Sequence, residues 1–83
     1  MKVDKELHVK NISSFYFSLR EEIETNSHII IDFSDTVRID SSAAQIILSA
    51  VNKVKELDKS IRFIGVSSEL GRLLNLAGIK LQQ

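Results

Sequence analysis

Residues 28 to 33, with the sequence His-Ile-Ile-Ile-Asp-Phe, limit more than any other stretch how this chain can fold. The run is too short for a helix and too apolar for a strand on the surface, so it predicts a buried central strand. Similar but weaker patterns predict a strand over residues 61–66 and short extended pieces over residues 5–9, 37–39 and 79–81.

Helical periodicity fills the stretches between these strands. Apolar residues recur every three or four positions in three groups: Phe15, Leu19 and Ile23; Ala44, Ile47, Leu48, Val51, Val54 and Leu57; Leu70, Leu73, Leu74 and Ala77. The first helix is expected to end near residues 25–26, the second to run from Asp40 to residues 58–59, and the third to begin at Ser67 or Ser68 and stop at Gly78.

The alternation of helices and strands indicates the fold class. Strands separated by helices pair in parallel through right-handed crossovers, which predicts an α/β fold. We expect a small sheet, mixed or mostly parallel, with amphipathic helices packed against it. With 83 residues there is room for one domain, spanning residues 1–83.

Composition narrows the classes of partner and compartment. The 11 basic residues balance the 11 acidic ones, so the chain lacks the positive field that would favour nucleic acid or an anionic membrane. The start of the chain is too polar for a signal peptide, and no apolar run reaches the roughly 20 residues that span a bilayer. The absence of cysteine excludes disulfides and thiolate chemistry. The sequence therefore predicts a cytoplasmic protein without direct membrane insertion.

The junction between the piece at 37–39 and the second helix carries the most distinctive polar residues. Asp40, Ser41 and Ser42 can each cap the free N–H groups of a helix start, and Ser42 with Gln45 fits a capping box. Ser41 then has no structural duty, at a helix end that favours added negative charge. Ser41 is therefore the first candidate for phosphorylation and Ser42 the second, although serines before a helix more often serve only as caps.

Elsewhere the sequence offers little support for catalysis. His8 and His28 lack the companions of a zinc site, and neither a phosphate-binding glycine loop nor a nucleophile elbow is found. Asp32, Asp35 and Asp40 could bind a divalent cation, but turn and capping duties explain them better. We expect no catalytic residue, metal site or cofactor.

Several of these stretches, taken together and in order, resemble the STAS family, the domain of anti-sigma-factor antagonists and of the cytoplasmic tails of sulfate transporters. The matching stretches are Ile30–Ser34, Val37–Ser42, the helix that follows, Ile61–Val66, Ser67–Leu70 and Leu76–Ile79. The compact front end, Glu6–Asn11, and the form of residues 43–48 look most like a short branch. That branch includes the small subunit of lipid-asymmetry ABC transporters and STAS proteins found with chemotaxis genes.

The resemblance implies a regulatory protein that works by partner switching. In the family, a serine or threonine directly after the motif aspartate is phosphorylated by a partner kinase, and the phosphate breaks the complex. Carried over to this chain, that residue is Ser41, and the partner is an anti-sigma factor or serine kinase. The expected contact residues are Asp35, Thr36, Asp40, Ser41, Ser42, Ala43, Ala44 and Gln45.

Two other functions stay open on the sequence. The chain could be an adaptor subunit of an ABC-type lipid-transporter ATPase, with Ser41 acting through hydrogen bonds. The presence of Ala43-Ala44, where antagonists usually have Gly-Leu, favours this adaptor role. A small nucleotide-binding or hydrolytic enzyme that uses the aspartates is a more distant alternative. A homodimer is also possible, if the short N-terminal region leaves a sheet edge exposed.

Overall fold

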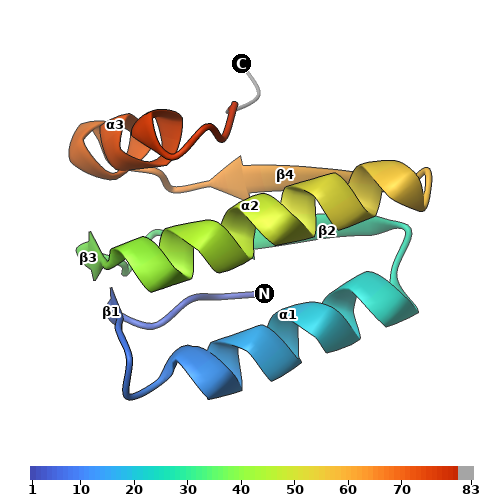
Figure 1. The fold of residues 1–83 in the computed structure, drawn as a ribbon, viewed down its shortest axis with the longest axis horizontal. Coiled ribbons are helices and arrows are strands. Elements are labelled where there is room, and N and C mark those ends of the chain that lie inside the picture. Colours follow the sequence, from blue (N-terminus) through green and yellow to red (C-terminus); the bar gives the residue numbers. More distant parts are fainter. Residues whose placement is uncertain (81–83) are drawn as a thin grey trace.

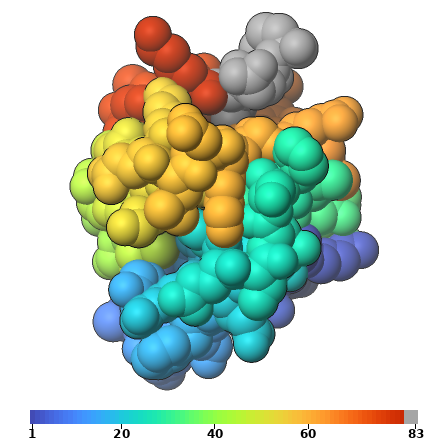
Figure 2. All heavy atoms as spheres, turned by 90° about the vertical axis from the view of Figure 1, so that its right-hand side faces the viewer, coloured from blue at the N-terminus to red at the C-terminus, as the bar shows by residue number. Residues whose placement is uncertain are grey.

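The structure is a computed structural model that describes residues 1–80. Its helices cover one face of the strands, as the end-on view in Figure 2 shows, and all three helices begin at the same end of the molecule (Figure 1). The elements in chain order are β1 (Glu6–Leu7), α1 (Ile12–Thr25), β2 (His28–Asp32), β3 (Arg38–Ile39), α2 (Ser41–Glu56), β4 (Ser60–Ile64) and α3 (Ser68–Leu76).

The strands form two parallel pairs that the N-terminal residues join. β1 pairs with β3, β2 pairs with β4, and both pairings are parallel. Lys2 forms a parallel bridge with Asp32, and the Val3 N–H donates to the Asp32 carbonyl at 2.9 Å. β2 is thus bonded on both edges, by residues 1–3 on one side and β4 on the other, which confirms the prediction of a central strand and of an α/β fold with a mostly parallel sheet.

Side chains alternate across β2 between the core and an open face. Ile29 and Ile31 are buried under α1 and α2, but Ile30 is 46% exposed. On β4 the neighbouring Ile64 is 38% exposed. The triple isoleucine therefore does not signal burial on both faces, because the helices described here cover one face only.

The core draws on every helix and on the strands. The first helix contributes Phe15, Leu19 and Ile23, and the third contributes Leu70 and Leu74, as their periodicity predicts. The residues that are fully buried and largest are Phe33, Leu7, Ile29, Ile31, Ile47, Leu74, Ile79 and Val54.

Several expected elements differ from the structure, and one of them is the strand expected over residues 61–66, which runs from Ser60 to Ile64. The strand expected over residues 5–9 is shortened to Glu6–Leu7, because the chain turns at residues 9–11 to enter α1. α2 ends at Glu56, two residues early, and Asp58 takes a left-handed conformation with a φ of 56°. The strand expected over residues 79–81 is absent at Ile79 and Lys80, where the buried Ile79 side chain closes the core instead, and Leu81 lies outside the described residues.

Candidate functional site

The candidate site is built on the start of α2, where β3 ends. Asp40 is the N-cap in extended conformation, and its Oδ1 accepts a hydrogen bond of 3.0 Å from the Ala43 N–H. The Asp40 carbonyl accepts the first helical bond, 3.1 Å from the Ala44 N–H. Asp40 therefore caps the helix alone.

Asp40 takes the place that the sequence also allowed for Ser42. Ser41 and Ser42 are the first two helical residues, so the expected capping box between Ser42 and Gln45 does not form. Both serine side chains are exposed, and neither hydroxyl bonds to any residue within the described part of the chain. Free hydroxyls at a helix start can accept a phosphate without breaking a structural bond.

Thr36 has a structural role that the sequence did not reveal. It is the one buried polar residue among those described, 4% exposed, and its Oγ1 donates to the Asp4 carbonyl at 2.8 Å. Its N–H donates to the Phe33 carbonyl at 3.0 Å, which closes the turn before β3. Thr36 thus fixes the turn to the N-terminal segment, and its side chain is not available to a partner.

The two alanines after the serines are also buried. Ala43 is fully covered and Ala44 is 8% exposed, because the apolar face of α2 begins there. The methyl group of Ala43, which replaces the glycine usual in antagonists, points into the core. It therefore adds no bulk to the surface beside Ser41 that a kinase would meet.

Five of the predicted contact residues remain accessible to a partner. Asp35, Ser41, Ser42 and Gln45 are exposed and Asp40 is half-buried. The structure adds Val37, which is 63% exposed, and the exposed Arg38. We call this set the α2-start surface: Asp35, Val37, Arg38, Asp40, Ser41, Ser42 and Gln45.

The sequence pattern around Val37 is misleading. A period of two places Val37 on the same side as the buried Ile39. β3, however, begins only at Arg38, so the alternation does not extend back to Val37. The sequence feature that could have indicated exposure is the position of Val37 directly before a very short strand.

The three aspartates of this region serve separate structural purposes. Asp32 accepts hydrogen bonds from the Ser34 N–H, at 2.8 Å, and from the Ser34 hydroxyl. Asp35 lies 3.4 Å from the Lys2 ammonium, with both side chains exposed, and Asp40 caps α2. In residues 1–80 no group of three or more His, Cys, Asp or Glu side chains could hold a metal ion.

The two bonds from Ser34 hold the pKa of Asp32 below its ordinary value of 3.8, and the Lys2 ammonium lowers it further. Ionised Asp32 therefore stabilises the native state above pH 3.8, and this contribution is lost as the pH falls through the lowered pKa. We expect Ser34→Ala to raise the pKa of Asp32 towards 3.8, so that the loss occurs at higher pH. An NMR titration of the Asp32 carboxyl carbon measures this shift.

The matched control for that titration is Ser14→Ala, because Ser14 is exposed on α1 and contacts no acid in the described structure. Its titration curve should overlay that of the wild type. If Asp32 kept the same pKa in the Ser34→Ala variant, the hydroxyl bond would not be the cause of the lowered value.

Comparison with known proteins supplies one positive match. The family model described as "STAS domain" matches residues 1–81, which is nearly the whole chain. A comparison with curated proteins finds no match. No described helix is both long enough and apolar enough to cross a membrane.

Proposed function

The chain belongs to the STAS domain family, and on that premise we propose that it binds a protein partner through the α2-start surface and is released by phosphorylation of Ser41. STAS domains mediate protein–protein interactions and are generally regulatory and not catalytic. The partner we propose is an anti-sigma factor or serine kinase, and the compartment is the cytoplasm. The observation that carries the proposal is the exposed, unbonded hydroxyl of Ser41 directly after the capping Asp40.

The position of Ser41 separates the effect of a phosphate on binding from its effect on folding. A phosphate adds roughly −1.5 to −2 charges at pH 7. At the first residue of a helix this charge meets the free N–H groups and the positive end of the helix dipole, so the fold tolerates it. A partner surface shaped for a neutral hydroxyl beside Asp40 would instead meet a cluster of negative charge.

We expect Ser41→Glu to weaken partner binding at least tenfold without lowering the midpoint of thermal unfolding, which should rise by about 1–8 °C, since a negative charge there stabilises the helix by ~0.3–1 kcal/mol. Ser68→Glu is the matched control, because Ser68 is the exposed first residue of α3. Pull-down from the source cell with the three proteins, quantified by mass spectrometry, measures the difference.

Two outcomes would count against the switch. Equal recovery of one partner by the wild type and by Ser41→Glu would show that charge at Ser41 does not control binding.

Intact-mass measurement of protein from its own cell, under phosphatase inhibition, should find one phosphate that maps to Ser41. An unmodified chain that holds a transporter ATPase in all growth conditions would favour the adaptor role instead.

A further inference from the structure

β4 is an edge strand whose outer side pairs with no other strand within residues 1–80. On its inner side the Ser60 N–H donates to the Ser27 carbonyl at 3.0 Å, and the Ile64 carbonyl accepts from the Phe33 N–H at 2.9 Å. In a parallel pair, alternate residues direct their backbone groups to the partner strand. The N–H and C=O groups of Ile61 and Phe63 therefore point away from β2, towards the open edge.

A groove of about 900 Å³ follows this edge. Its floor is apolar, formed by the side chains of Val51 and Val54 from α2 and of Ile61 and Phe63 from β4. Unpaired backbone groups above an apolar floor are the features that an extended peptide uses when it adds a strand to a sheet.

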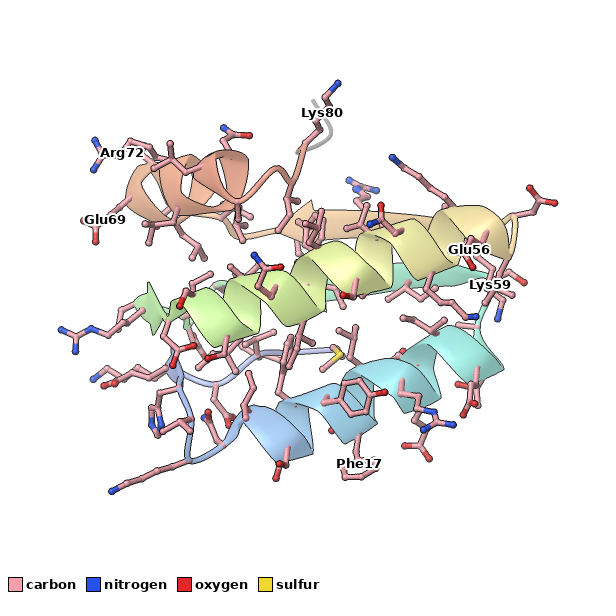
Figure 3. All side chains as sticks on the ribbon, viewed as in Figure 1. Phe17, Glu56, Lys59, Glu69, Arg72 and Lys80 are labelled. Carbon is pink, nitrogen blue, oxygen red and sulfur yellow. The ribbon has the colours of Figure 1, made fainter. Side chains whose placement is uncertain are left out.

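The charged residues that line the groove are all basic. Lys55, Arg62 and Lys80 contribute cations from α2, β4 and the segment after α3, and no carboxylate lies among the lining residues. None of the three forms an ion pair with a described residue. Lys59 also reaches the groove, but its ammonium donates to the Ile23 carbonyl at the end of α1 (Figure 3).

We propose that the β4 edge binds an extended acidic segment of a protein partner, which adds to β4 as a further strand. The segment would pair with the free groups of Ile61 and Phe63. Successive side chains of a strand point to opposite faces, so its carboxylates would reach Lys55 on the helix side and Arg62 on the open face. The net formal charge of the chain is zero, so this positive groove is a local feature and not a general excess of base.

The charge at the edge argues against a second copy of this chain as the occupant. An antiparallel β4–β4 pair that used the free groups of Ile61 and Phe63 would set each Arg62 opposite the other, in the closely spaced type of residue pair. Like charges directly opposite one another destabilise a sheet. An acidic strand meets the same positions with opposite charge.

This binding surface is separate from the α2-start surface. Lys55 lies 14 residues along α2 from Ser41, which corresponds to about 20 Å at the rise of an α-helix. The proposal therefore does not depend on phosphorylation of Ser41, and either can fail alone.

The probe is the capped hexapeptide Val-Glu-Glu-Glu-Glu-Val, labelled for fluorescence anisotropy, in which neighbouring glutamates place carboxylates on both faces of the strand, with a counterpart that has lysine in place of each glutamate. We expect the acidic peptide to bind at low salt and to shift the NMR amide signals of Ile61 and Phe63, while the basic peptide does not bind. Lys55→Glu and Arg62→Glu should each weaken binding at least tenfold. Lys10→Glu, which reverses an exposed charge outside the groove, should leave it unchanged.

Two N-methylated peptides test the backbone pairing. Methylation of alternate amides blocks the hydrogen bonds of one edge of a strand, so one of the two patterns should abolish binding and the other should retain it. Equal binding of both patterns would overturn the strand addition and leave a purely electrostatic contact. The proposal also fails if the acidic peptide does not bind, or if the protein forms a dimer in which the Ile61 and Phe63 amides are protected.

Discussion

Gly65→Ala is expected to lower the free energy of unfolding by about 2–5 kcal/mol. Gly65 has a φ of +67°, where a side chain costs about 1–2 kcal/mol. A Cβ there would also lie 2.7 Å from the Ser34 nitrogen and 2.8 Å from its Cα. These are backbone atoms, so the turn before β3 would have to move, and such overpacking costs about 1–3 kcal/mol more.

Gly78→Ala is the matched control for this variant. Gly78 has a φ of +93°, but a Cβ there would meet no atom within 4 Å among the described residues. Its cost should be that of the backbone alone, about 1–2 kcal/mol. Urea unfolding of the wild type and both variants measures the two costs. Equal destabilisation by the two substitutions would show that the contact with Ser34 adds nothing to the cost of Gly65→Ala.

Phe33→Ala is expected to lower the free energy of unfolding by about 3–5 kcal/mol, as truncation of a buried aromatic residue usually does. Phe33 is 1% exposed, and its ring stacks on that of Phe63 with centroids 5.9 Å apart. A domain of this size has only ~4–12 kcal/mol of stability in total, so this loss removes about a quarter of it or more. Circular dichroism during urea unfolding measures this loss.

Phe17→Ala provides the control for an aromatic truncation outside the core. Phe17 is 65% exposed and points away from the rest of the molecule on α1 (Figure 3). Surface substitutions of this kind usually change stability by less than about 0.5 kcal/mol. A comparable loss of unfolding free energy in both variants would mean that burial of the Phe33 ring in the core is not the cause of the loss.

Local patterns in the sequence were sufficient to predict the helices, the central strand and the class of fold. Asp40 and Ser67 do cap α2 and α3, because a capping bond joins residues only three positions apart. The choice between Asp40 and Ser42 was not decided by the sequence, since both have the right chemistry. The chain enters α2 at the end of β3, and this geometry selects Asp40.

Features that depend on contacts between distant residues could not be predicted in the same way. In the sequence alone Thr36 looks like an ordinary turn residue. Its hydrogen bonds to the carbonyls of Val3 and Asp4 exist only in the folded chain. The strand expected over residues 61–66 ends at Ile64, and the close approach of Gly65 to Ser34 arises only when β2 and β4 lie side by side. The open face of the sheet is also a property of the layers and not of the isoleucine run.

The parallel pairing of all the strands has a consequence for the order of folding. Each pair, β1 with β3 and β2 with β4, joins segments that a complete helix separates in the chain. No strand pairs with a neighbour through a local hairpin. The chain must instead close the long loops that contain α1 and α2, and the entropy cost of closing them is offset only once the strands pair. During synthesis the N-terminal residues leave the ribosome first, yet they cannot pair in the sheet until β2 and β3 have been synthesised.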